Sequence, residues 1–283
     1  MKGKKGSFTL ENKGISGAVI KAAADITMLI DHLGASVVVA VYYAAAKAQR
    51  TQILQNYHLM RNIGRIAFPL FIFLLIEGFF YTKSRAKYLL RLSIFSLLSE
   101  IPFDLAIVLK KAEVQSGTIL EFTSQNVFFT LAIGLACIWI CDLVLEAGTG
   151  HEKGTAHILE FPEWKDLRGW AVLLGKGLIC AAVAFAAMAA AAALKTDYGR
   201  WGIAAICAAY AMKKIGLTWL VHPAAVAVLC LLASSEAYAL FGWPLTLFYR
   251  GERGRQLPRY FYYAYYPGHL LILGLLKIFV FSK

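Results

Sequence analysis

Apolar residues gather in long blocks along this chain, and short polar stretches separate the blocks. We expect about nine apolar segments, each a membrane helix, because about 20 helical residues cross a bilayer. The sixth and eighth segments are short, which is typical of tilted, re-entrant or buried helices. The pattern therefore predicts an all-α fold, a polytopic integral membrane helical bundle. The expected segments cover residues 15–44, 62–82, 88–109, 125–146, 169–194, 200–213, 215–234, 236–249 and 261–281.

Composition agrees with this class of protein. Hydrophobic residues make up 59% of the 283 residues and charged residues only 16%, against about 25% charged in soluble domains. No loop is long enough to fold alone, so we expect one transmembrane domain over residues 1–283, with a polar, basic tail at 1–14. The tail is not followed by an evident cleavage site, so we expect the first helix to be retained.

The five cysteines all lie in apolar stretches. An odd number argues against a disulfide framework, and none has metal-site spacing with histidine. We interpret them as small core residues and expect no metal site.

The net charge is +12. In a soluble protein this would suggest nucleic acid, but here the basic residues cluster in the gaps between apolar blocks. That placement is typical of a topology signal and of attraction to anionic lipid headgroups. We therefore expect the lipid bilayer as a partner and no nucleic acid. With nine crossings, the bias of basic residues predicts a cytoplasmic N-terminus and an outer C-terminus.

An acid and an imidazole stand side by side inside the first apolar segment, in the stretch MLIDHLG. Ionisable groups at membrane depth are costly, so Asp31 and His32 are functional candidates. Asp25 precedes His32 by seven residues and shares its helix face. The alternative is a histidine that is merely satisfied within the core. We favour catalysis, because histidine titrates near neutral pH and suits proton transfer.

The second segment opens with RNIGRIAFPLF. Arg61 and Arg65 are four residues apart and share a helix face near the expected outer interface. They fit either snorkelling to the interface or binding of an anionic or carbonyl group near His32. Pro69 is expected to kink the helix or free a carbonyl, and Glu77 follows at depth.

Further polar groups occur at depth in three other stretches. In SEIPFD, Ser99 precedes Glu100 and Asp104, which share a face and would repel unless one is protonated or a cation lies between them. Pro102 is expected to interrupt this helix. Two roles stay open for these carboxylates. They could pair with the arginines of the second segment, or they could bind substrate. The stretch QNVFFT contains Asn126. The stretch DYG, at an expected outer turn, contains Asp197 and Tyr198.

The C-terminal part supplies a histidine and a basic loop. His269, in YYPGHL, is expected at the start of the last helix, on the inner half and away from His32. The glycine-rich loop YRGERGR lies on the expected inner side. Its residues Arg250, Arg253 and Arg255 suit phosphate binding, although basic cytoplasmic loops are common in membrane proteins.

Six stretches, taken together and in this order, resemble the TraX family, which is named for the pilin acetylase of conjugative plasmids. The matching text is TMLIDHLGA, RNIGRIAFPLFIFLLIEGFFYT, YLLRL…LLSEIPFDLA, QNVFFTLAIGL, TDYGRWGI and YRGERG…YYAYYPGHLLIL, over about residues 25 to 275. The resemblance implies a multi-pass protein of the bacterial cytoplasmic membrane. It puts His32 at the catalytic position, with Asp31 beside it. It also puts these residues in family motifs without individual roles: Arg61, Arg65, Glu77, Ser99, Glu100, Asp104, Asn126, Asp197, Tyr198 and His269.

That family is similar to a larger group of transmembrane acyltransferases. These move an acetyl group from cytoplasmic acetyl-CoA to an acceptor at the far face, using a histidine in an early helix. The resemblance therefore implies acetyl-CoA as co-substrate and an acceptor amine or hydroxyl, carried by a peptide, a protein, a sugar or a small amine. It does not name the acceptor, and the oligomeric state, a homo-oligomer included, stays open.

On this interpretation His32 acts as a general base toward the acceptor or carries the acetyl group itself. Asn126 or the Arg61/Arg65 pair would stabilise the oxyanion, and the arginine loop would hold the phosphates of acetyl-CoA. A transporter or proton-coupled permease could use the same acids and histidines, but no internal repeat is evident. A structural membrane subunit would leave the costly polar groups unexplained.

Overall fold

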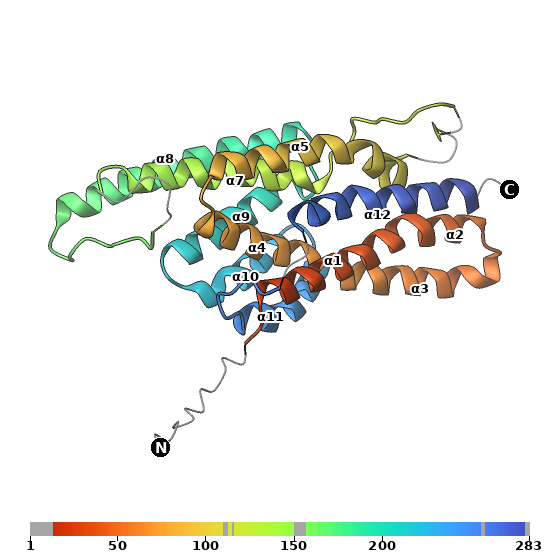
Figure 1. Cartoon of the computed structure of the whole chain (residues 1–283), viewed down its shortest axis with the longest axis horizontal. Coiled ribbons are helices and arrows are strands. Elements are labelled where there is room, and N and C mark those ends of the chain that lie inside the picture. The colour runs from red at the N-terminus through yellow and green to blue at the C-terminus, as the bar shows by residue number, and fades with distance from the viewer. Residues whose placement is uncertain (1–13, 110–112, 115, 150–156, 256–257, 281–283) are drawn as a thin grey trace, which may run out of the picture.

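The computed structural model describes residues 14–109, 113–114, 116–149, 157–255 and 258–280. Its elements are helices, and within these ranges the only strand-like pairings are two isolated bridges. Most of the helices run along the long axis of the molecule (Figure 1). The α-helices are α1 (Gly17–Leu33), α2 (Val39–Ala44), α3 (Lys47–Gly64), α4 (Ala67–Tyr81), α5 (Arg85–Phe103), α7 (Val127–Glu146), α8 (Leu167–Ala193), α9 (Gly199–Lys214), α10 (Val221–Leu229), α11 (Trp243–Leu247) and α12 (Arg259–Val280).

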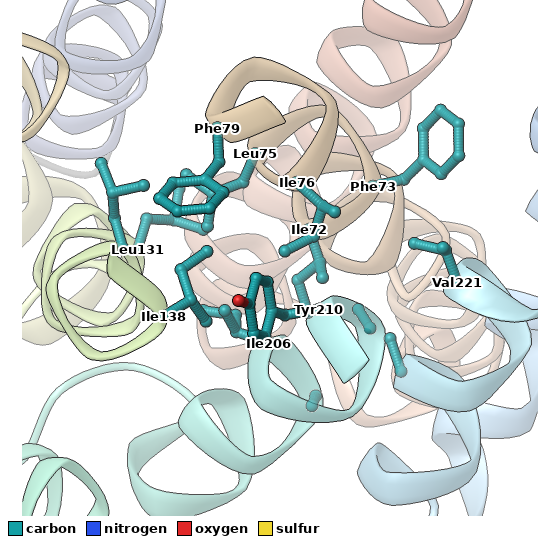
Figure 2. Close-up of a cluster of buried hydrophobic side chains, with 14 of the residues drawn as sticks. Ile72, Phe73, Leu75, Ile76, Phe79, Leu131, Ile138, Ile206, Tyr210 and Val221 are labelled. Carbon is teal, nitrogen blue, oxygen red and sulfur yellow. The ribbon is translucent and has the colours of Figure 1, made fainter. Parts of the chain in front are cut away.

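Helix α4 lies at the centre of the bundle because it is apolar on nearly every side. A helix that is hydrophobic all round is stable only when other helices cover it. Figure 2 shows Ile76 and Phe79 of α4 facing Ile138 of α7 and Tyr210 of α9. All four side chains are buried, so this contact holds α4 between α7 and α9.

Within the part of the chain that the structure describes, four helical stretches are long and apolar enough to cross a membrane. They are Gly17–Ala44, Lys47–Tyr81, Val127–Glu146 and Leu167–Ala193, and a shorter apolar helix covers Thr218–Leu229. The all-helical fold and its membrane character are thereby confirmed. The count of nine crossings and the cytoplasmic N-terminus stay predictions, and residues 1–13 of the basic tail lie outside the described residues.

The polar segment between the first two predicted helices is itself a helix, which the hydrophobic pattern did not predict. Residues 47–64 form α3, whose side chains are mostly exposed and polar. Its polar residues outnumber its apolar ones, so it does not stand out as an apolar block in the sequence. Together α3 and α4 span 35 residues, about 52 Å of helix against an apolar core of about 30 Å. The α2–α3 hairpin lies beside α12 at one end of the bundle (Figure 1).

Two of the helical prolines have different consequences. Helix α3 ends at Gly64 and α4 begins at Ala67, so Pro69 follows a break, as expected. Pro102 does not interrupt its helix, contrary to the prediction. Helix α5 continues through it to Phe103 and then into a π-helical turn, η2 (Asp104–Val108). The wider turn absorbs the local distortion, as π-turns within helices commonly do.

The chain between α9 and α12 is a hairpin of short pieces. A 3-10 turn, η3 (Thr218–Leu220), leads into α10, and a 3-10 helix, η4 (Ser234–Gly242), leads into α11. The loop that follows is held against the start of α1. The amide of Gly17 donates to the carbonyl of Glu252 over 2.8 Å, and that of Ala18 donates to Arg253 over 2.9 Å. Two otherwise unpaired amides of the α1 N-terminus are satisfied in this way.

Candidate active site

Two histidines from distant parts of the sequence meet inside the bundle. Nδ1 of His32 in α1 lies 2.7 Å from Nε2 of His269 in α12. The two rings stack with 5.0 Å between centroids and an 8° angle between planes. His269 is buried and His32 keeps partial exposure. The pair is thus a rigid unit with one accessible ring.

Hydrogen bonding fixes the tautomers of this pair. Nδ1 of His269 lies 2.7 Å from the carbonyl oxygen of Tyr265, which can only accept, so Nδ1 carries the proton. Nε2 of neutral His269 is then an acceptor, and Nδ1 of His32 must donate to it. The lone pair of neutral His32 is consequently on Nε2, which has no hydrogen-bond partner among the described residues. A basic nitrogen is left available for a substrate proton.

The prediction that His269 lies away from His32 is wrong, because the two rings are in contact. Helix α12 begins at Arg259 and continues through Pro267, so His269 lies ten residues inside the helix. At 1.5 Å per residue, this is about 15 Å along the axis.

Asp31 forms an ion pair with Arg61 of α3. The carboxylate packs directly on Gly64, where a Cβ atom would collide with Oδ1 of Asp31. Glycine therefore permits α1 and α3 to approach closely here. Oδ1 of Asp31 is buried without a hydrogen-bond partner among the described residues. The sequence analysis expected Arg61 near His32 but did not predict this ion pair.

Arg65 pairs with a residue that the sequence analysis missed. Its Nη1 lies 2.8 Å from Oε1 of Glu236 in η4, and the Glu236 side chain is 0% exposed. Nε of Arg65 is buried and has no partner among the described residues. Glu236 is the first residue of the expected eighth segment, 236–249, and the sequence analysis did not single it out. Its place within an otherwise apolar stretch was the available signal.

Asp197 and Tyr198 form the turn between α8 and α9 and lie close to this ion pair. Tyr198 has a φ of +60°, an uncommon value for a residue other than glycine, and its ring stacks on Phe68 with 3.9 Å between centroids. The carbonyl of Asp197 accepts a hydrogen bond from Thr130. Burial raises the pKa of the Asp197 carboxyl to about 6; nearby Asp31 acts in the same direction and Arg61 opposes it.

Tyr266 is a second residue that the sequence analysis missed. It is buried, with its ring centroid 5.8 Å from that of His32 in an edge-on arrangement. The ring also meets Phe128 of α7 with 4.8 Å between centroids. Tyr266 therefore packs the histidine pair against the start of α7. The four tyrosines of YYAYY gave no indication of which one would do so.

Glu100 and Asp104 do not pair with the arginines of the second segment. Oε1 of Glu100 accepts the backbone N–H of Asn126 over 3.0 Å and also its side-chain amide. Oδ2 of Asp104 accepts the backbone N–H of Glu121 over 2.7 Å. Arg61 and Arg65 already have other carboxylate partners, so the pairing that the sequence left open does not occur. Ser99 is buried and donates to the carbonyl of Phe95.

Asn126 is the N-cap of α7. Its Oδ1 accepts the N–H of Phe128 over 3.0 Å, and its Nδ2 donates to the carbonyl of Ser96 over 2.7 Å as well as to Glu100. Both amide donors are therefore engaged within the fold.

Glu77 belongs to a different part of the bundle. Its Oε1 lies 2.6 Å from Nζ of Lys213 at the end of α9. Glu77 comes twelve residues after Arg65, about 18 Å further along the helix. Nearby, Asp142 of α7 pairs with Arg85 and Lys214 at 2.9 Å each. These pairs lie at the end of the bundle opposite the α2–α3 hairpin (Figure 1).

The three arginines of the basic loop are exposed. Nε of Arg250 lies 3.0 Å from Oε2 of Glu252. Because this loop is bonded to the N-terminus of α1, it stands at the start of the helix that carries His32. The structure thus connects the predicted phosphate-binding loop and the predicted base through one element.

No group of three or more metal-binding side chains occurs in the part of the chain that the structure describes. The five cysteines are free thiols, and the sulfur atoms of Cys137 and Cys207 lie 3.7 Å apart between α7 and α9.

Comparison with known proteins identifies the family of the chain. Residues 16–277 match the family model described as TraX protein. A curated relative, "Probable fimbrial assembly protein FimC, serogroup H1" from Dichelobacter nodosus, is 26% identical over 289 residues, which cover 95% of this chain and 98% of the relative. No solved structure matches the chain. The family match covers nearly the whole chain, and the chain therefore belongs to the TraX family.

Proposed function

We propose that this protein is a membrane-embedded acetyltransferase in which His32 is the catalytic base. It moves an acetyl group from cytoplasmic acetyl-CoA to an amine or hydroxyl at the outer side of the membrane. The observation that carries the proposal is the hydrogen-bond chain from the Tyr265 carbonyl through His269 to His32. This chain leaves a basic nitrogen on a partly exposed ring, held by a second group as general-base histidines usually are.

The step balances with His32 alone as base. Nε2 of His32 takes the proton of the acceptor while the acceptor nitrogen or oxygen attacks the acetyl carbonyl carbon. The bond between that carbon and the CoA sulfur then breaks with its electron pair on sulfur. The imidazolium returns the proton to the thiolate, giving CoA and the acetylated acceptor. His269 keeps accepting the Nδ1 proton throughout and so stabilises the imidazolium.

Arg65 is the best candidate for the oxyanion donor. Its buried Nε has no partner among the described residues, while Nη1 is held by Glu236. A fixed cation with an open donor suits the charge that develops on the carbonyl oxygen. Asn126 is a weaker candidate, because both of its amide donors are already bonded within the fold.

Nine crossings with the N-terminus in the cytoplasm would put the arginine loop on the side where acetyl-CoA is made. The basic ends of α5 and α9 would then lie on the same side, as the distribution of positive charge favours. The α2–α3 hairpin would stand at the outer face. The name of the curated relative, a fimbrial assembly protein, favours a protein amino group as the first acceptor to test.

The test is binding of acetyl-CoA to detergent-purified protein, followed by release of CoA with three acceptors: a peptide with a free amino terminus, glucosamine and ethanolamine. We expect binding, and turnover with at least one amine or hydroxyl. A transporter or permease using the same groups would not release CoA. Protein that neither binds acetyl-CoA nor releases CoA would contradict the proposal.

A further inference from the structure

A stripe of polar side chains runs along the seam between α1 and α12. Nζ of Lys21 in α1 lies 3.5 Å from the centroid of the Tyr262 ring in α12. One turn further along, the Tyr265 hydroxyl donates to the carbonyl of Asp25 over 3.3 Å. These four residues are all partly buried, and the sequence analysis gave none of them a role in binding substrate.

This stripe joins two places that already carry the proposed function. At one end, α1 begins at Gly17, where the arginine loop is bonded. At the other end, the carbonyl of Tyr265 holds His269 against His32. Both helices start at the loop and run in the same direction (Figure 1). A molecule that enters at the loop and displaces these contacts along the seam would therefore reach the histidine pair.

The length of acetyl-CoA decides which of its parts meets which residue. About twelve bonds separate the pyrophosphate from the sulfur, which is about 14 Å when extended, at three bonds per 3.3–3.6 Å as in a peptide chain. Lys21 is eleven residues before His32, about 16 Å along the axis, whereas Gly17 is about 22 Å away. The arm is too short for its pyrophosphate to stay at the loop while the thioester meets His32.

We propose that the seam between α1 and α12 is the channel for the pantetheine arm of acetyl-CoA, with Lys21 as the ligand of the pyrophosphate. The ammonium group of Lys21 is a mobile point charge suited to phosphate. Asp25 accepts an amide N–H of the arm, and the loop arginines contact only the adenosine 3′-phosphate. This inference rests on the proposed function, which it deepens.

The experiment measures dissociation constants by calorimetry in detergent, on a His32→Ala background so that no turnover occurs. The probes are acetyl-CoA, acetyl-4′-phosphopantetheine and acetyl-pantetheine, which lose first the adenosine end and then the phosphate. Lys21→Gln should weaken binding of the first two by about tenfold or more and leave the third unchanged. An Arg250→Gln, Arg253→Gln double variant should weaken acetyl-CoA binding alone.

Lys21→Arg keeps the charge and should bind all three thioesters within about threefold of the parent. Lys47→Gln, at the exposed start of α3, is the matched control and should change nothing. Equal effects of Lys21→Gln on all three probes, or no effect, would overturn the channel and leave the acetyltransferase standing. If the parent binds no thioester at all, the proposed function itself fails. Thermal melting of each variant shows that it is folded.

Discussion

His32 and His269 are 237 residues apart in the sequence, and Nδ1 of one lies 2.7 Å from Nε2 of the other. The contact sets the tautomer of His32 and thereby decides which nitrogen can act as a base. It also ties the first long helix to the last, so the site forms only when the whole chain has folded.

His269→Ala removes the acceptor of the His32 Nδ1 proton. We expect kcat to fall by about 10- to 100-fold, the range seen when the partner of a working histidine is lost. The dissociation constant of acetyl-CoA should stay the same. His269→Gln restores a carbonyl acceptor and should recover part of kcat. Steady-state kinetics of the parent and the two variants check this. Full activity of His269→Ala would show that the hydrogen bond from His32 to His269 has no role in catalysis.

Gly64→Ala places a methyl group where the Asp31 carboxylate now lies. The side chain must leave Arg61 or the two helices must separate, so we expect a loss of about 1–3 kcal/mol in the free energy of unfolding. Acetyl transfer should fall as well. Gly175→Ala in α8 is the matched control, because a Cβ atom there meets nothing within 4 Å. If both variants melt alike, close packing at Gly64 is unimportant.

Glu236→Ala leaves the Arg65 guanidinium without its carboxylate. Breaking a buried pair from one side costs about 3–5 kcal/mol, and chemical unfolding in detergent measures it. Glu236→Gln keeps an acceptor and should cost less. Glu252→Ala removes an exposed partner of Arg250 and should cost about 1 kcal/mol or less. Equal costs at both positions would contradict the assignment of Glu236.

Asp197→Asn tests the raised pKa of that carboxyl. The folded state binds this proton more tightly than the unfolded state, so Asp197 alone makes unfolding easier as pH rises from 3.8 to about 6. We expect Asp197→Asn to melt higher than the parent above pH 6 and the difference to vanish near pH 4. A constant difference across that range would mean that the carboxyl has an ordinary pKa.

The sequence predicted the helices that carry an apolar pattern and missed the one that does not. Polar residues outnumber apolar ones over residues 47–64, so this stretch does not stand out as an apolar block and only the backbone shows that it is helical. In the same way, Asp31 and His32 were found because an apolar helix makes ionisable groups conspicuous. Glu236 also lies in a mainly apolar stretch, but it was missed because it is the first residue of an expected segment.

Relationships between distant residues could not be predicted from one sequence. The two arginines were identified together, yet their separate partners, Asp31 and Glu236, come from α1 and η4. The six motif stretches likewise do not all meet: Glu77 is paired with Lys213 at the other end of α4. A motif marks which residues matter, and only the packing of the helices decides whether they serve the site or the scaffold.

The most direct measurement is the rate of CoA release from acetyl-CoA by the His32→Ala variant, with the peptide, glucosamine and ethanolamine as acceptors. His58→Ala, at an exposed histidine of α3, is the control. We predict that His32→Ala binds acetyl-CoA as tightly as the parent but releases CoA about 10²- to 10⁴-fold more slowly, while His58→Ala is unchanged. A His32→Ala variant that turns over at the parent rate would contradict the account.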